Sequence, residues 1–459
     1  MQKKINCDIA ILGAGPAGYT AALRAAELGA NVVLIEKKDL GGVCLNDGCI
    51  PTKALLKTAE IASEHDRAKE FGIESHIDNM NWNAAVNRKN RVVKSLNIGL
   101  DQLLKSKEIT IIKGWGTVTS SRSLLVETEE GPVVVNCDKM IITTGAVPMI
   151  PPIKGIDTEG VITSSEALMM EKLPSSLVII GAGAIGLEFA SIMNPLGVKV
   201  TVIELQDRIL PEEDREIAEE LFKILKREGI SIKLSAEVLE IQKTQEDLEI
   251  LYAVGNKQFT TKCEKILIAA GRKLNTDLLQ SIPLNLSNNA IVVGENMETN
   301  IEGVYAAGDV VGGRLLAHLA FREGTVAAEN ALGMNTKINY QAIPSCVYTN
   351  PEVAAVGMTE EKATEAGIAV KVGRSNFRDN GRALTLGERE GFVKVITDQS
   401  GTIIGGQIMG FYASEIISEL TLAITLGAKA EDLATMIHPH PALSEAIWQA
   451  CGDLVKVDL

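Results

Sequence analysis

Two stretches of the chain repeat one arrangement of apolar and polar positions. Each opens with a continuous apolar run, at residues 8–12 and 176–180, and continues into a segment with helical spacing. A second apolar run follows in each, at residues 31–36 and 199–204. A short apolar run buried on both faces, then an amphipathic helix and another run, is typical of a βαβ unit in a parallel sheet. The pattern therefore predicts an α/β protein with two such units.

A G-x-G-x-x-G motif joins the first run to the helix in both repeats. Its glycines allow a tight turn, leave room for a pyrophosphate and let helix and strand pack closely. Glu36 and Glu204 each lie 23 residues beyond the first glycine (36 − 13 and 204 − 181), where a carboxylate can accept hydrogen bonds from ribose hydroxyls. One motif alone could be an ordinary turn, but two matched copies predict two dinucleotide-binding sites. The glycines are Gly13, Gly15, Gly18, Gly181, Gly183 and Gly186.

A second matched pair of apolar runs, at residues 139–145 and 265–271, ends in small residues and glycine. Gly145 and Gly271 offer backbone that a cofactor can approach closely. A further run ends in Gly-Asp, and the carboxylate of Asp309 could hold a ribitol hydroxyl. A plain turn is the alternative at this last position.

The order of these patterns predicts one dinucleotide-binding domain with another inserted into it. The first domain covers residues 1–148, the inserted domain covers 149–272, and the first resumes over 273–333. From 334 to 459 the glycine motif is absent. Strand-like runs and an amphipathic helix at residues 414–426 predict a separate α+β domain there.

Composition and charge remove several classes of function. The 459 residues carry a formal charge of -14, and only 4% are aromatic. Nucleic acids and anionic membranes need clustered Lys and Arg, and base stacking needs aromatic side chains, so neither partner is expected. No run of about 20 uncharged apolar residues occurs, and the N-terminus lacks the core of a signal peptide. We expect a soluble, cytoplasmic protein.

Seven cysteines are too few, and odd in number, for a disulfide-stapled scaffold. Cys44 and Cys49 stand apart because Pro51 and the residues after it predict a helix that starts near Cys49. A helix N-terminus stabilises a thiolate, and four intervening residues allow the two sulfurs to bond. A redox-active disulfide is favoured over a metal site, for which two further ligands are missing. The five solitary cysteines are expected to be buried apolar side chains: Cys7, Cys137, Cys263, Cys346 and Cys451.

Two of the five histidines lie together near the C-terminus, in the segment His438-Pro-His440-Pro. The ordinary pKa of histidine suits His440 to act as a general base, and Glu445, expected one turn into the next helix, could orient its ring. A pair of surface histidines in a Pro-rich loop is the alternative. The other three, His65, His76 and His318, are expected to be structural.

Four motifs in this order resemble the pyridine nucleotide–disulfide oxidoreductase family over essentially the whole chain. They are the two glycine motifs, the run Cys44-x-x-x-x-Cys49-x-Pro51-x-Lys53, and the segment from His440 to Glu445. The resemblance implies that the first dinucleotide fold binds FAD and the second binds NAD. It also implies that the last domain is a dimerisation domain, that the protein is a homodimer with shared active sites, and that the His440–Pro441 peptide is cis.

The same resemblance implies a role for each residue of the redox site. Cys49 would lie beside the flavin, and Cys44 would exchange with the substrate. Lys53 would lie near the flavin and pair with Glu188. His440 of the partner subunit would be the base, oriented by Glu445. The other residues expected to contact a cofactor are Glu36, Gly116, Thr144, Gly145, Glu204, Gly271, Asp309 and Ala317.

Within that family the chain is most similar to the branch that oxidises protein-bound dihydrolipoyl groups with NAD. Glu204 would repel a 2′-phosphate and so favours NAD over NADP. The expected partner is a lipoyl-bearing protein of a 2-oxoacid dehydrogenase or glycine cleavage system, and no metal is expected. Two alternatives stay open: an NAD(P)H-dependent reductase of another low-molecular-weight disulfide, and a flavoprotein subunit that serves mainly as a docked component of a complex.

Overall fold

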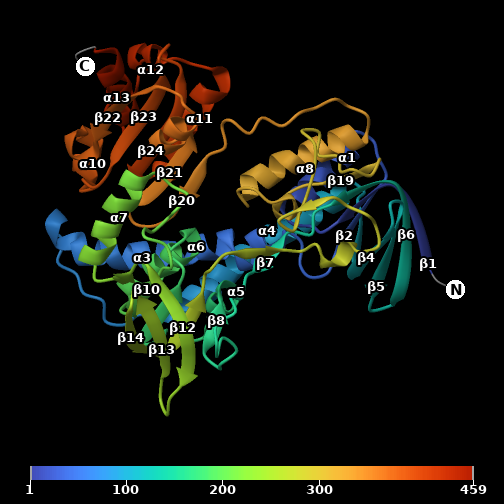
Figure 1. Cartoon of the computed structure of the whole chain (residues 1–459), viewed down its shortest axis with the longest axis horizontal. Helices are drawn as coiled ribbons and strands as arrows, with labels where there is room; N and C mark the ends of the chain where they lie inside the picture. The colour runs from blue at the N-terminus through green and yellow to red at the C-terminus, as the bar shows by residue number, and fades with distance from the viewer. Residues whose placement is uncertain (1–2, 457–459) are drawn as a thin grey trace.

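The computed structural model describes residues 3–456 and contains the predicted two α/β units and a C-terminal α+β unit (Figure 1). The first unit is built on a seven-stranded sheet in the order β3-β2-β1-β6-β5-β4, with β19 also paired to β6. Its strands β1, β2, β3, β6 and β19 pair in parallel. The strands are β1 Lys3–Leu12, β2 Val32–Glu36, β3 Thr110–Lys113, β4 Trp115–Ser120, β5 Ser123–Thr128, β6 Gly131–Ile142 and β19 Val304–Ala306.

The apolar run of β1 is buried on both faces, as the pattern predicts: Ile9, Ala10 and Ile11 are all fully inaccessible to solvent. Helix α1 (Pro16–Glu27) connects β1 to β2 and packs beside α8 (Ala317–Ala331) on one side of the sheet (Figure 1). The first sheet is therefore completed by β19, and α8 packs against α1 beside it. Both elements come from far later in the chain.

The second unit has a five-stranded parallel sheet in the order β11-β10-β9-β15-β8. The chain enters it after β7 (Ala146–Pro148) and leaves it through β16 (Arg272–Leu274), and these two strands pair with each other. An antiparallel sheet, β12-β13-β14, lies beside it. The elements are β8 Val161–Thr163, α5 Ser164–Ala167, β9 Ser176–Ile180, α6 Ala184–Met193, β10 Lys199–Ile203, α7 Arg215–Arg227, β11 Ser231–Lys233, β12 Ala236–Lys243, β13 Leu248–Val254, β14 Lys257–Cys263 and β15 Lys265–Ile268.

The C-terminal unit is an antiparallel sheet in the order β20-β21-β24-β23-β22, covered by helices. Its strands are β20 Ser345–Val347, β21 Glu352–Gly357, β22 Val370–Asn376, β23 Phe392–Asp398 and β24 Ile403–Gly410. Its helices are α9 Glu360–Glu365, α10 Gly381–Leu386, α11 Ala413–Leu426, α12 Ala430–Thr435 and α13 Glu445–Val455. The helix expected at 414–426 is α11.

Three α-helices lie between β2 and β3: α2 Gly42–Asp47, α3 Cys49–Arg67 and α4 Trp82–Ser106. The predicted redox segment lies on α2 and α3. The helix expected near Cys49 begins there, whereas α2 was not foreseen. A short hairpin, β17 Leu286–Ser287 with β18 Ala290–Ile291, precedes β19. In the part of the chain that the structure describes, no helix has both the length and the apolar character needed to cross a membrane.

Candidate active site

The two glycine motifs fold alike, and both leave space where a dinucleotide needs it. The first glycine of each has a left-handed φ, 105° at Gly13 and 107° at Gly181. A Cβ on the third glycine would meet the first glycine's carbonyl oxygen at 1.8 Å for Gly18 and 2.1 Å for Gly186, so only glycine fits there. Helices α1 and α6 start just after the second glycine, with no side chain capping their first N–H groups. Such uncapped N–H groups bind phosphate oxygens.

The two ribose-site carboxylates also repeat one geometry. Glu36 accepts hydrogen bonds from the N–H groups of Ala14 (2.8 Å) and Lys38 (2.9 Å). Glu204 accepts them from the N–H groups of Ala182 (2.6 Å) and Gln206 (2.8 Å). Each carboxylate is thus held against its own glycine loop, and its contact with a dinucleotide ribose remains a prediction.

Cys44 lies on α2, and Cys49 is the first residue of α3, with Gly48 between the two helices. Both side chains are partly buried free thiols, and a hydrogen bond joins them. That hydrogen bond, with help from the nearby Lys53 ammonium, lowers the pKa of Cys49 to about 7. The same hydrogen bond, with burial, raises the pKa of Cys44. The pair is therefore asymmetric, with the negative charge placed on Cys49.

Lys53 and Glu188 form the predicted ion pair between α3 and α6. The Lys53 Nζ lies 2.9 Å from both carboxylate oxygens of Glu188, which is only 6% exposed. Tyr348 was not predicted: its N–H donates to Glu188 Oε1 at 3.1 Å, and its ring centroid lies 4.3 Å from Lys53 Nζ. The ammonium is thus fixed one helical turn from Cys49.

We expect Lys53→Met to raise the pKa of Cys49, because it removes a positive charge that favours the thiolate. Thiolate absorbance of the reduced protein, followed against pH, should rise at higher pH in the variant than in the wild type. Lys57→Met is the control, because Lys57 lies on the same helix and pairs with Glu60 at 2.7 Å. Coincident curves for Lys53→Met and the wild type would show that Lys53 does not act on this thiol.

His440 and Glu445 are joined as predicted, with 2.8 Å between Nδ1 and Oε1. The N–H of Ala442 donates to the other oxygen at 2.7 Å. Burial would raise the pKa of Glu445, but these two hydrogen bonds outweigh it and lower that pKa. Glu445 is the first residue of α13, so the expectation that it lies one turn into the helix was wrong. The His440 side chain is 80% exposed and turned to solvent, and the His440–Pro441 peptide is cis.

His438 has a different environment from its neighbour. Its side chain is only 4% exposed, and its Nε2 lies 2.9 Å from Glu419 on α11. This hydrogen bond fixes the loop that carries His440. Of the two clustered histidines, only His440 is free to meet a substrate.

The contact of Arg272 with Asp309 near β19 was not foreseen, and neither was the buried Glu323 beside it. Arg272 lies 3.5 Å from Asp309, and its Nε is buried without a hydrogen-bond partner among the described residues. Burial raises the pKa of Asp309. Glu323 accepts a hydrogen bond from the Gly308 N–H at 2.8 Å, and burial raises its pKa to about 7. An acid on the buried face of the Ala-rich helix α8 was a sequence clue to this residue.

Of the other predicted cofactor residues, Thr144, Gly145 and Gly271 lie where the two parallel sheets join. Thr144 Oγ1 donates to the Asn275 carbonyl at 2.7 Å, and the Asn275 N–H donates to the Gly145 carbonyl at 2.9 Å. Gly271 accepts from the Met149 N–H at 3.0 Å. Gly116 packs against the end of β1, and Ala317 begins α8. Their contact with a cofactor remains a prediction.

These features fit both cofactors. The Arg272 Nε lies 3.5 Å from Asp309 but has no hydrogen-bond partner among the described residues, so it can donate to a polar ligand at the first site. Gly183 faces open space at the second site. The uncapped N-termini of α1 and α6 suit a pyrophosphate, and the carboxylates of Glu36 and Glu204 suit the hydroxyls of a ribose. The described residues contain no group of three or more His, Cys, Asp and Glu placed to hold a metal ion.

Four of the five remaining cysteines are buried as expected, whereas Cys346 is only partly buried. Burial raises the pKa of all five other thiols, so none is activated. Ser75 hydrogen-bonds His65 and the Pro344 carbonyl contacts His318, while His76 pairs on the surface with Asp78.

Comparison with known proteins assigns both parts of the chain. Residues 7–324 match the model of the pyridine nucleotide-disulphide oxidoreductases, and residues 343–451 match the dimerisation domain of the same family. A dihydrolipoyl dehydrogenase of Bacillus subtilis is 40% identical over 96% of this chain and 97% of its own. One of Thermus scotoductus is 41% identical over 98% and 97%. The crystal structure of LpdA from Mycobacterium tuberculosis superposes with a TM-score of 0.90 at 28% identity, covering 98% and 99%.

Proposed function

Because this chain belongs to the pyridine nucleotide-disulphide oxidoreductases, we propose that it is a dihydrolipoyl dehydrogenase, which oxidises protein-bound dihydrolipoyl groups with NAD. The cysteine pair, with Cys49 at the start of α3 and one helical turn from Lys53, is the observation that carries this proposal. A low pKa at Cys49 makes it the better leaving thiol, so an incoming thiolate attacks Cys44.

The reaction begins with the Cys44–Cys49 disulfide. His440 of the partner subunit takes a proton from one thiol of the dihydrolipoyl group, and the thiolate attacks Cys44. The bond between Cys44 and Cys49 breaks, and Cys49 leaves as a thiolate. The second substrate thiol then displaces Cys44, which releases the cyclic disulfide and leaves the enzyme with two thiols.

Bound FAD supplies the two-electron relay between the cysteine pair and NAD. The chain supplies the alignment and the charge. Lys53, held by Glu188 and Tyr348, stabilises the Cys49 thiolate, while the two glycine loops hold the pyrophosphates. Each turnover converts one dithiol and one NAD into one cyclic disulfide, one NADH and one proton.

The dimerisation domain matched at residues 343–451 supports a homodimer. The exposed ring of His440 supports a role in the active site of the partner subunit, because it meets no thiol of its own chain among the described contacts. The proposed substrate-bearing partner is a lipoyl protein of a 2-oxoacid dehydrogenase or glycine cleavage system, and the proposed location is the cytoplasm.

One assay tests this function. Purified holoenzyme, given free dihydrolipoamide and NAD, should produce NADH and lipoamide. If the protein reduces dyes with NADH but does not turn over dihydrolipoamide, the proposal fails. Reduction of another small disulfide would then favour a different reductase, and its absence would favour a docked subunit.

Cofactor choice is expected to depend on Glu204. We expect Glu204→Arg to raise the KM for NAD and to shift the NAD/NADP preference toward NADP, because a cation replaces the carboxylate at the ribose. Steady-state rates with both cofactors measure the shift. Glu36→Gln at the other dinucleotide site is the matched control, expected to weaken FAD retention without changing that preference. An unchanged NAD/NADP ratio in Glu204→Arg would contradict the ribose contact.

A further inference from the structure

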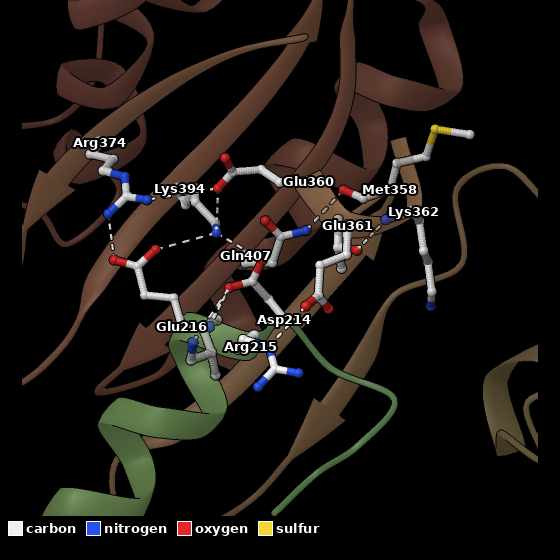
Figure 2. A network of polar contacts seen from close by, with 12 residues as sticks. Asp214, Arg215, Glu216, Met358, Glu360, Glu361, Lys362, Arg374, Lys394 and Gln407 are labelled. Carbon is white, nitrogen blue, oxygen red and sulfur yellow. Dashed lines mark hydrogen bonds and ion pairs between the residues drawn. The ribbon is translucent and has the colours of Figure 1, made fainter. Parts of the chain in front are cut away.

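Lys394 on β23 is a buried cation that no step of the proposed reaction uses. It is 1% exposed, and three carboxylates surround its Nζ (Figure 2). Asp214 lies at 2.7 Å, Glu360 at 2.8 Å and Glu216 at 3.4 Å. Burial would lower the pKa of Lys394, but the hydrogen bonds with Asp214 and Glu360 outweigh it and raise that pKa. The lysine is therefore charged.

The carboxylates come from two different parts of the molecule. Asp214 caps α7 by accepting from the N–H groups of Glu216 and Ile217, and Glu216 lies in the first turn of that helix. Glu360 belongs to α9, in the same C-terminal unit as Lys394. The cluster thus fastens the start of α7 to the C-terminal sheet (Figure 2). Burying charges costs nearly as much free energy as their attraction returns, so the cluster is better explained by a geometric role than by stability.

Asp214 directly follows a loop that begins after Glu204. This loop, residues 205–213, also touches the glycine motif: the Leu210 N–H donates to the Ala182 carbonyl at 3.0 Å. Ala182 in turn donates its N–H to Glu204 at 2.6 Å. The loop, the glycine motif and the ribose-site carboxylate are therefore one connected unit.

The C-terminal unit holds the loop at two further points. Arg208 lies 3.3 Å from a carboxylate oxygen of Glu361, and Arg215 pairs with the same residue at 3.0 Å. Ser345 on β20 donates its hydroxyl to Glu213 at 2.9 Å. Three separate contacts from the C-terminal unit thus hold residues 208–214, next to the proposed NAD ribose.

We propose that Lys394 and Glu361 are positioning residues for NAD: by holding residues 205–214, they keep Glu204 and the second glycine loop in the geometry that binds the cofactor. This inference rests on the proposed NAD site. It links the dimerisation domain to cofactor affinity through the loop at residues 205–214. Loss of the anchor allows the loop to move, and small displacements of binding groups reduce affinity.

Lys394→Met, which keeps the length of the side chain and removes its charge, is the direct test. We expect the KM for NAD to rise roughly tenfold, because only binding interactions are weakened. The KM for dihydrolipoamide, kcat and the visible flavin spectrum should change by less than about twofold, since none of the redox groups is touched. A general loss of structure would move all of these together.

Arg227→Met provides the matched control. Arg227 lies at the other end of α7 and pairs with Glu390 of the C-terminal unit at 2.8 Å, on the surface. Its loss removes an ion pair between the same two units but leaves residues 205–214 anchored, so the KM for NAD should not change. An equal rise in both variants would overturn the proposal, as would an unchanged KM in Lys394→Met.

Glu361→Gln keeps the test decisive if Lys394→Met does not fold. Glu361 is 42% exposed in its side chain, so the variant is expected to fold, and it loses its ion pairs with Arg208 of the loop and Arg215 of α7. We expect a smaller rise in the KM for NAD, and no rise would overturn the proposal. The KM for NADH, measured with a dye as acceptor, tests the positioning role of Lys394 and Glu361 without the disulfide substrate. If the wild type fails with dihydrolipoamide, the proposed function is refuted. The dye assay then still shows whether the two residues position the cofactor site.

Discussion

Replacing Cys44 with serine is expected to abolish dihydrolipoamide oxidation and to leave the flavin in place. The hydroxyl cannot form the mixed disulfide that the first exchange step requires, so the rate should fall by roughly a thousandfold or more. Serine can still donate a hydrogen bond to Cys49, and Lys53 remains nearby, so the thiolate at Cys49 should persist. Reduction of a dye by NADH does not need the disulfide and should continue.

Among the cysteine variants, the loss of dihydrolipoamide oxidation is expected only when a cysteine of the redox pair is replaced. Cys346→Ser is the matched control, because Cys346 is another partly buried thiol, and burial raises its pKa. For both variants, lipoamide formation is measured in stopped assays, and the visible flavin spectrum is recorded separately. Wild-type lipoamide turnover in Cys44→Ser would refute the assignment of the interchange thiol.

The repeated apolar runs were enough to predict the two parallel sheets. Residues 8–12 and 176–180 lie in β1 and β9, and all of these residues except Asp8 and Ser176 are buried. Local spacing also singled out Glu36 and Glu204, and each lies against its own glycine loop because the acid and the loop belong to one βαβ unit. Chemistry that lies within one supersecondary unit can be inferred from spacing.

Contacts between distant parts of the chain could not be inferred in that way. Tyr348 reaches Glu188 across 160 residues, and Lys394 reaches Asp214 across 180. Nothing in the local pattern around a lysine on a strand tells which carboxylate it will meet. The pairing of Lys53 with Glu188 was foreseen only through the resemblance to a family, and helix α2 was missed because glycines flank it on both sides.

His440→Gln is expected to reduce dihydrolipoamide oxidation by roughly a hundredfold to ten-thousandfold, the usual contribution of a general base. Glutamine keeps a polar side chain of similar reach but cannot take the substrate proton at neutral pH. Dye reduction by NADH should remain, since His440 meets neither Lys53 nor the two cysteines of its own chain among the described contacts. His438→Gln is the control, because His438 is buried against Glu419. Comparable lipoamide losses in both variants would indicate a disturbed loop rather than a missing base.

A heterodimer tests whether that base comes from the partner subunit. If subunits carrying Cys44→Ser are paired with subunits carrying His440→Gln, one of the two sites combines an intact Cys44 with an intact His440 from the other chain. The isolated heterodimer should then regain about half of the wild-type activity, as two equivalent sites in a symmetric dimer require. A base acting within its own chain would leave both sites defective, and the heterodimer would be as inactive as either parent. Differently tagged subunits and sequential affinity purification provide the heterodimer, and each homodimer serves as its baseline.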